Sequence, residues 1–432
     1  MTKALTRGTP VAVAASAAVP IGLLALAGFA TGSGMRLLDP LLPLVADSLH
    51  VTVADASVLI ASFMLPYGLA QAVLGPLGDR LGKLRVVCVS MLFYGVFATA
   101  CAAAPGMAAL VALRAASGLF AGAVIPLIMA HLGDSVPYAD RQAVLGRFLT
   151  GMVMAQMLTG PIAGVIGGYG GWRPVFLVLG VLGIAVGAGL AVRFGRKLWQ
   201  TPDAPGPGAV PGPVAYLRLL KRPIGRWLLL SAFFDGLCLL GGAFPFAGAF
   251  LIDEFGLDPA AAGLIVAGFG VGSFAYTRFA RVLVRRFGEG NLLLLGGTGV
   301  AAGLVGMALT PSWPVAACIQ VLIGLTFYMF HGVLQARATE ALPEARGAAV
   351  SAYALALFMG TGAGALAFGA VLAAGGYRVG FAAAAGAMLI VTFASRAGLG
   401  ALSRDPERTY RTNLKSNPSP SGSTSPTVGF GK

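Results

Sequence analysis

A short polar stretch reads Gly75-Pro76-Leu77-Gly78-Asp79-Arg80-Leu81-Gly82-Lys83-Leu84-Arg85 and joins two apolar segments, residues 54–77 and 84–104. Its glycines permit a tight reversal of the chain. Asp79 and Arg80 supply a charge pair that can lock neighbouring helix ends. Each flanking segment is long enough to cross a hydrocarbon core of about 30 Å. The stretch therefore predicts a hairpin between two membrane-spanning helices.

The rest of the chain repeats this alternation of apolar segments and short breaks. Of the 432 residues, 57% are hydrophobic and only 11% are charged, whereas about 25% are charged in soluble domains. The mean hydropathy is +0.83. The hydrocarbon of lipid offers no hydrogen-bond partner to backbone N–H and C=O groups, so apolar segments that cross it must be helices here. The sequence thus predicts an all-α membrane protein with twelve transmembrane helices, at residues 20–46, 54–77, 84–104, 107–132, 144–166, 175–194, 227–252, 260–283, 292–309, 314–336, 348–373 and 379–395.

The basic residues are distributed unequally about this expected membrane. The chain holds 30 Lys and Arg against 16 Asp and Glu, a net charge of +14. Outside the segments, only Arg173 and Arg378 fall on the side opposite to the two termini. Cytoplasmic loops carry the excess of Lys and Arg in membrane proteins. We therefore expect both termini in the cytoplasm, and we attribute the positive charge to membrane orientation and not to nucleic-acid binding.

The two halves of the chain repeat each other. Three pairs of landmarks are separated by one common interval: Arg80 and Arg285, Arg141 and Arg346, Trp172 and Tyr377. The repeat predicts two six-helix bundles related by an axis along the membrane normal, with substrate between them near the midplane. The expected organisation is a cytoplasmic tail 1–19, bundles 20–198 and 225–398, a cytoplasmic Pro/Gly-rich linker 199–224, and a disordered cytoplasmic tail 399–432.

Several motifs resemble those of the major facilitator superfamily of secondary transporters. The stretch 75–85 resembles the loop signature of that superfamily over its whole length, and Arg114-Ala115-Ala116-Ser117-Gly118 resembles its Arg-x-x-x-Gly motif. Gly160-Pro161-Ile162-Ala163-Gly164 is similar to the signature of its drug:proton antiporter branch, with Val165 in place of a final Gly. The resemblance is to bacterial twelve-span efflux permeases. It implies the major facilitator fold, a place in the bacterial inner membrane, and alternating access to a central site.

Ionisable side chains inside the segments are functional candidates, because each costs at least about 2.5 kcal/mol to insert. They fall in the first, fourth, seventh and tenth segments, which the superfamily resemblance places around the central cavity. These residues are Arg36, Asp39, Arg114, Asp235 and His331. We expect Asp235, close to the midplane, and then Asp39 to carry a coupling proton, since low dielectric disfavours the charged form of a carboxyl. Arg114 stays charged and is expected to hold an anionic partner or a carboxylate.

Other polar residues are candidates for contacts with substrate. Arg36 lies one helical turn from Asp39, so that the two form a structural ion pair or take part in binding. His331 is either a packed histidine or a cavity residue, and Gln71 and Gln156 either line the cavity or bond between helices. The candidate set for the substrate cavity is Arg36, Gln71, Gln156, His331 and Gln335.

The hairpin loop is also expected to act as a cytoplasmic gate. Asp79 and Arg80 are within reach of the expected ends of segments four, five and eleven, which carry Asp134, Arg147 and Arg346. Contacts among these residues would hold the halves together when the cavity opens outward and would break when it opens inward.

The sequence as a whole favours secondary active transport. We expect proton-coupled efflux of hydrophobic or amphipathic small molecules by a monomer in the lipid bilayer, which binds substrate and protons and uses the proton gradient without a cofactor. An alternative is a proton-coupled importer of a sugar or organic acid, and another is a non-transporting receptor or scaffold. No nucleophile, base and orienting group can be assembled, which argues against an enzyme. The cysteines lie singly in apolar runs, so no metal site is indicated.

Overall fold

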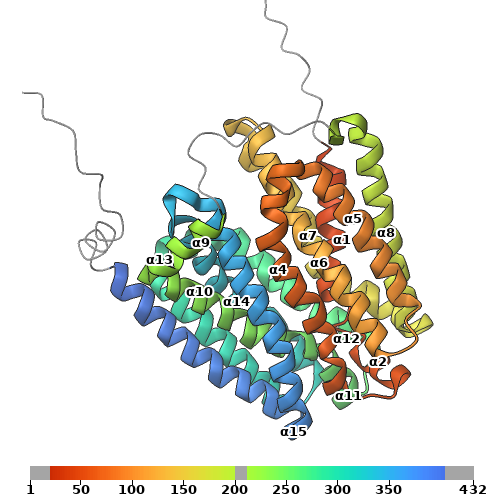
Figure 1. The fold of residues 1–432 in the computed structure, drawn as a ribbon. Coiled ribbons are helices and arrows are strands. Elements are labelled where there is room, and N and C mark those ends of the chain that lie inside the picture. The colour runs from red at the N-terminus through yellow and green to blue at the C-terminus, as the bar shows by residue number, and fades with distance from the viewer. Residues whose placement is uncertain (1–19, 200–211, 404–432) are drawn as a thin grey trace, which may run out of the picture.

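A computed structural model describes residues 20–199 and 212–403, and within these ranges every element is helical (Figure 1). The all-α prediction is confirmed. The first half contains the helices α1 (Ile21–Arg36), α2 (Leu42–Leu49), α3 (Val53–Ala56), α4 (Val58–Leu81), α5 (Lys83–Ala102), α6 (Met107–Ser135), α7 (Tyr138–Gly170) and α8 (Trp172–Phe194), followed by the short 3-10 helix η1 (Gly195–Trp199).

The second half begins with a helix that precedes its first span. Its elements are α9 (Gly212–Lys221), α10 (Pro223–Asp235), the π-helix η2 (Gly236–Ala243), the 3-10 helix η3 (Phe244–Phe246), α11 (Ala247–Phe255), α12 (Pro259–Val266), α13 (Gly268–Leu309), α14 (Trp313–Glu340), η4 (Pro343–Ala345) and α15 (Arg346–Ser403). α9 lies inside the region that the sequence analysis treats as a linker, and it includes the last proline of that region, Pro213. α15 continues to Ser403, whereas the tail was expected from residue 399. The expected tail 1–19 and most of the expected C-terminal tail lie outside the described residues.

Two of the long helices are each two spans joined at a glycine. At 1.5 Å per residue, the 42 residues of α13 would measure about 63 Å if straight, far more than a bilayer core. The chain turns at Gly288 in α13 and at Gly376 in α15, where φ is 72° and 78°, in the left-handed region that suits glycine.

Contacts with α14 show that the two parts of α13 run in opposite directions. Before the turn, Gly268 packs beside Ala317 and Gly272 beside Leu325, so the first part runs with α14. After the turn, Gly296 packs beside Phe330 and Gly303 beside Ile323, so the second part runs against α14. α13 is therefore a helical hairpin.

α15 reverses in the same way beside α10 and η2. Its first part runs with them, because Gly360 packs on Phe233 and Gly364 on Leu237. Its second part runs against them, because Ser395 bonds to Ser231 and Gly398 packs on Trp227. Nine apolar helical stretches of the described chain are long enough to cross a membrane. Two of them are these hairpins, and the broken helix α1–α2 adds one more, so the described residues contain the twelve expected spans.

The first and seventh spans are broken near their middles, which the sequence analysis did not foresee. Between α1 and α2, the chain passes through the turn 37–41, in which Pro40 has no backbone N–H to continue the helical ladder. The seventh span changes from α-helix to π-helix at Gly236 and then to a 3-10 turn around Pro245. A Cβ atom on Gly241 would lie 1.7 Å from the carbonyl oxygen of Thr361, so this break fits against the α15 backbone.

The two halves meet at one end of the molecule. We call this the far end, because it is opposite to the linker end, where η1 and α9 lie (Figure 1). There, α7 packs against α12 so closely that the backbones of Gly164 and Pro259, and of Gly160 and Gly263, touch. α4 packs against α15 in the same part, with Gly362 beside Leu65. Figure 1 shows the two groups of helices converging toward α2, α11 and α12.

Candidate functional site

The most deeply buried acid of the described chain is paired with a histidine. Asp235, the last residue of α10, has a fully buried side chain, and its Oδ2 lies 2.7 Å from Nδ1 of His331 on α14. The other carboxyl oxygen, Oδ1, has no hydrogen-bond partner among the described residues. Both residues are candidates from the sequence, for different roles, and the structure brings them together.

Nδ1 of His331 has two neighbours that compete for it. The Tyr353 hydroxyl of α15 is 3.2 Å away, and Asp235 is closer, at 2.7 Å. An imidazole nitrogen either carries a hydrogen and donates or has a lone pair and accepts. If Nδ1 carries the hydrogen, it donates to the Asp235 carboxylate. If Nδ1 has the lone pair, it accepts from the Tyr353 hydroxyl or from a protonated Asp235. Asp235, His331 and Tyr353 therefore have two hydrogen-bond arrangements, which differ by one proton.

A chain of aromatic rings leads from this pair toward the other half of the molecule. The His331 ring stacks on Phe327 with centroids 4.9 Å apart, and Phe327 lies 5.5 Å from Phe269. Phe269 in turn lies 4.4 Å from Phe244 of η3. The guanidinium of Arg36, from α1, sits 4.4 Å above the Phe244 ring, which is a favourable cation–π geometry. This contact joins the halves.

A second charged group lies at the break in the first span. Arg36 Nη1 is 3.8 Å from Asp39 Oδ2, and Arg36 Nε donates to Gln156 Oε1 of α7 at 2.9 Å. Both charged side chains are buried. Asp39 Oδ1 and Arg36 Nη1 nevertheless lack a hydrogen-bond partner among the described residues. The expected proximity of Arg36 and Asp39 is confirmed, and their unused atoms leave capacity for a further partner.

Arg114 is held by backbone carbonyls. Its Nη1 donates to the oxygen of Gly34 at 3.0 Å and its Nε to that of Leu59 at 3.3 Å, while its guanidinium lies 4.4 Å from the Phe63 ring. Among the described residues no carboxylate pairs with it. In this state it therefore ties the helices α1, α4 and α6 together, a role that the sequence analysis did not name.

The remaining cavity candidates are not all gathered at this site. Gln156 contacts Arg36, as described, and Gln71 is buried on α4. Gln335 is exposed, one helical turn beyond His331 toward the linker end. Phe327, Phe269, Phe244 and Tyr353 were not singled out from the sequence, because aromatic residues in an apolar chain give no signal that separates a site from ordinary packing.

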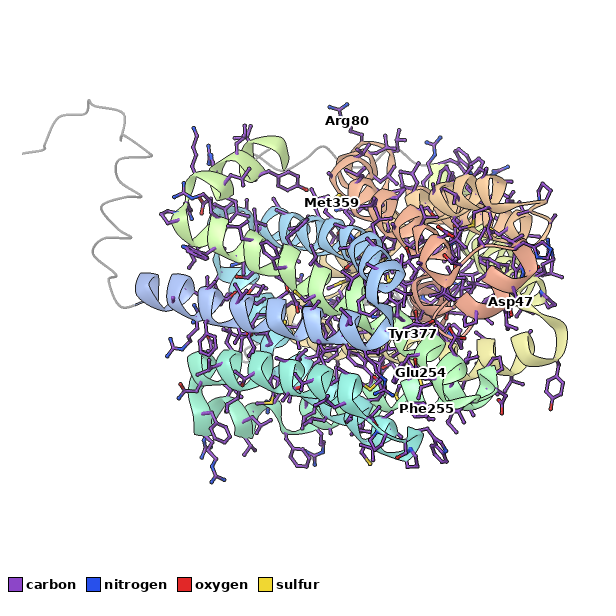
Figure 2. All side chains as sticks on the ribbon, turned by 90° about the horizontal axis from the view of Figure 1, so that it is seen from below. Asp47, Arg80, Glu254, Phe255, Met359 and Tyr377 are labelled. Carbon is purple, nitrogen blue, oxygen red and sulfur yellow. The ribbon has the colours of Figure 1, made fainter. Side chains whose placement is uncertain are left out.

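The proposed gate residues are spread over the linker end. The side chain of Asp79 lies outside the described residues. Asp134 forms an ion pair with Lys83 of α5, within the same half. Arg80, Arg147 and Arg346 are exposed, and Figure 2 shows Arg80 projecting away from the helices. In the described part of the chain, these residues form no ion pair between the halves, and the cytoplasmic gate stays a prediction.

The far end carries its own polar contacts within the second half. The Tyr377 hydroxyl donates to Asp253 Oδ2 at 2.6 Å, and Arg378 lies 3.5 Å from Glu254. Arg378 also donates to the carbonyl oxygen of Ala308 at 2.9 Å. Tyr377 and Glu254 come together at this end in Figure 2. These contacts fasten the start of the twelfth span to the end of the seventh.

Known proteins resemble the chain over most of its length. A model of the Major Facilitator Superfamily matches residues 24–251 and 228–426. The uncharacterised MFS-type transporter YceJ of Bacillus subtilis is 27% identical over 78% of this chain and 85% of its own. The multidrug efflux protein YfmO of the same organism is 27% identical over 76% of this chain and 80% of its own. A crystal structure of a mutant of the nucleoside transporter NupG superposes with a TM-score of 0.69 at 14% identity, covering 88% of this chain and 98% of that one.

Proposed function

The chain belongs to the major facilitator superfamily, and from this we propose that it exports hydrophobic or amphipathic small molecules in exchange for protons. The family makes it a membrane transporter of small molecules and not an enzyme. Direction, substrate and coupling ion are parts of the proposal. Contacts at the site, the closed far end and one relative support them.

Proton coupling is supported by the pair of Asp235 and His331. A carboxyl group in hydrocarbon favours its neutral form, so it can bind a proton from one side of the membrane. It can release this proton when its access to water or its hydrogen-bond partner changes. Asp235 has no arginine or lysine beside it among the described residues, so its charge is balanced only when His331 or the carboxyl itself takes a proton. Asp39 is already paired with Arg36, which makes it the second choice. The buried contact of Asp235 with His331 is the observation that carries the proposal.

An apolar, aromatic substrate is supported by the rings between the two charged groups. Phe327, Phe269 and Phe244 form a continuous row from His331 to Arg36. Rings of this kind offer large contact areas and stack on planar groups of a ligand. Arg36 Nη1 and Asp39 Oδ1, which have no hydrogen-bond partner among the described residues, add one donor and one acceptor at the end of the row. This composition suits a molecule with an apolar body and a small polar group.

Export is supported by the relative named as a multidrug efflux protein. The alternative is proton-coupled import of a sugar or organic acid. A non-transporting receptor is the remaining alternative, and a solute flux would exclude it. If both termini are cytoplasmic, as we propose, the packing of the halves at the far end corresponds to access from the cytoplasm, the state in which an exporter loads its substrate and an importer releases it. We further propose that the protein acts as a monomer in the bacterial inner membrane.

The decisive test measures flux in proteoliposomes. Purified protein is reconstituted with a panel of fluorescent amphipathic compounds and of sugars, and a pH gradient is imposed in either direction. We expect uphill movement of amphipathic compounds against the proton flow, and no such movement for Asp235→Asn. Movement of substrate with the protons would establish import. Full gradient-driven flux in Asp235→Asn would remove Asp235 from the coupling step.

A further inference from the structure

A cavity of about 400 Å³ lies between the third and sixth spans at the linker end, away from the site described above. Its size is typical of small-ligand pockets. Apolar side chains of α5 and α8 form one wall, among them Val89, Leu92 and Ala191. Arg85, Arg196 and Trp199 also line it, and we refer to the two arginines, its charged residues, as its rim. The transport proposal uses none of these residues.

The cavity exists because the chain turns back after the sixth span. α8 ends at Phe194, and the next residue, Gly195, has a φ of 48° in the left-handed region. The 3-10 helix η1, which begins there, folds over the start of α5. Leu198 is buried and anchors η1. Trp199 is 65% exposed, yet its ring lies 4.2 Å from the Arg85 guanidinium. Tryptophan at the end of a span is typical of the membrane–water interface.

The two arginines of the rim have no acidic partner in the described residues. The Arg85 guanidinium contacts the face of Trp199, and Arg196 is exposed. Two uncompensated guanidinium groups above an apolar wall match a phosphate joined to an acyl chain, since guanidinium binds phosphate oxygens through paired hydrogen bonds. Basic pockets between transmembrane helices on the cytoplasmic side bind acidic lipid headgroups in this way.

The wall below the rim faces lipid. Val89, on α5, is 38% exposed. Val192, which follows the cavity residue Ala191 on α8, is 85% exposed. Residues so exposed within spans contact the hydrocarbon of the bilayer. An acyl chain can therefore enter the cavity sideways from the leaflet, while its headgroup reaches Arg85 and Arg196 at the surface.

We propose that this cavity binds one anionic phospholipid from the leaflet at the linker end. Its phosphate lies between Arg85 and Arg196, its glycerol lies under Trp199, and one acyl chain follows Val89 and Leu92. A zwitterionic lipid brings an ammonium group that two arginines repel, so phosphatidylglycerol binds better than phosphatidylcholine. A bound lipid joins η1 to α5 and so holds the end of the sixth span. The proposal is independent of what the transporter carries.

The test uses the full chain, purified and depleted of lipid in detergent. Native mass spectrometry titrates phosphatidylglycerol and phosphatidylcholine with identical acyl chains, and a parallel titration follows soluble glycerol phosphate by thermal shift. We expect one tight phosphatidylglycerol site and weaker binding of phosphatidylcholine. Arg85→Gln and Arg196→Gln should each weaken phosphatidylglycerol about tenfold or more, since each removes hydrogen bonds between charged groups. Arg281→Gln, an exposed arginine of α13 outside the cavity, is the matched control and should change nothing.

Several results would overturn the proposal. Equal affinities for the two lipids would show that the arginines do not select charge. Phosphatidylglycerol could also bind through general attraction by the basic surface. Unchanged affinity for this lipid in both cavity variants, or an equal loss of affinity in Arg281→Gln, would show that it does. Glycerol phosphate binding as tightly as the lipid would show that the apolar wall is unused. The monodispersity of each variant checks that it folds, and Trp199→Leu provides a variant of the cavity that keeps both charges.

Discussion

At the scale of single residues, one ring nitrogen links Asp235, the acid that we propose binds the coupling proton, to a third helix. Nδ1 of His331 is shared by Asp235 from α10 and by Tyr353 from α15, so three helices of the second half meet at one atom. When Asp235 is ionised, the Tyr353 hydroxyl cannot donate to Nδ1, because the hydrogen on this nitrogen points at the carboxylate. When Asp235 binds a proton, Nδ1 becomes an acceptor and Tyr353 can bond to it. Proton binding thus changes a bond to α15, the helix that packs against the first half.

This arrangement predicts a shift in the pH dependence of transport for Tyr353→Phe. The hydroxyl stabilises the form in which Asp235 is protonated, so its loss should move the pH of half-maximal transport downward. One hydrogen bond contributes about 0.5–1.5 kcal/mol, which corresponds to about 0.4–1 unit. Flux in proteoliposomes as a function of pH measures the shift. Tyr328→Phe is the matched control, since its ring lies 6.1 Å from that of His331 and its hydroxyl makes no hydrogen bond to Nδ1 in the described structure. An unshifted profile in Tyr353→Phe contradicts the role of the hydroxyl.

Arg114 carries a prediction about stability as well as transport. Arg114→Lys keeps the charge but replaces the two guanidinium nitrogens that donate to the carbonyl oxygens of Gly34 and Leu59 with a single ammonium nitrogen, so we expect one of these bonds to be lost. A buried acceptor left without a donor costs about 1–3 kcal/mol. We therefore expect Arg114→Lys to lower thermal stability in detergent and to keep part of the transport, and Arg114→Ala to lose both. Normal stability in both variants would show that the carbonyl contacts do not hold these helices.

At the scale of elements, the spans were predictable from the sequence, and their breaks were not. Twelve apolar segments follow directly from hydropathy, because lipid imposes length and composition on each span. The breaks have weaker signals. Pro40 and Pro245 mark them, but Pro126 and Pro161 lie inside α6 and α7, which continue as single helices. Packing decides between these outcomes: η2 bulges where the α15 backbone comes closest, at Gly236 and Gly241.

At the candidate site, too, the sequence predicted the residues but not how they pack together. The positions of Asp235 and His331 in the seventh and tenth segments were predictable, whereas their contact was not. The two residues are 96 positions apart in the sequence, and this separation does not indicate how α10 and α14 are rotated relative to each other. Arg36 and Asp39 lie on one turn, so local geometry sufficed for them. Residues that act through tertiary packing, such as Phe244 and Tyr353, became visible only in the fold.

The π-helix provides the prediction at this scale. Gly241→Ala would place a methyl group 1.7 Å from the Thr361 oxygen, so η2 and α15 must separate. Overpacking of this kind costs about 1–3 kcal/mol. We expect a lower melting temperature and a loss of transport. Gly386→Ala in α15, where no atom lies within 4 Å of the added methyl group, should keep both, because alanine favours a helix over glycine. Equal behaviour of the two variants would refute the close contact at η2.

At the scale of the whole molecule, the far end is closed by backbone contacts between α7 and α12. These contacts involve Gly160, Gly164, Pro259 and Gly263, and they leave no room for side chains. A transporter that alternates must open this seam while the linker end closes. The equilibrium between the two states therefore depends on how closely two glycine-rich surfaces fit.

A methyl group added at this contact between α7 and α12 should shift the equilibrium between the two states. A methyl group at Gly164 would lie 2.1 Å from the Pro259 oxygen, whereas one at Gly168, one turn further along α7, would lie 3.9 Å from its nearest neighbour. We expect Gly164→Ala to populate a state with the far end open and Gly168→Ala to resemble the wild type. Distances between spin labels at the far ends of α7 and α12 report this directly. Identical distance distributions in both variants would mean that the seam does not set the equilibrium.

The glycine seam also has a consequence for how fast the far end can close. Side chains that meet at an interface must each be confined to one rotamer, and this loss of conformational entropy slows and weakens docking. Glycine has no rotamers to confine, so the surfaces at Gly160 and Gly263 can dock and part without any such ordering. At this contact between α7 and α12, closure therefore needs the rigid-body approach of two helices and no ordering of individual side chains.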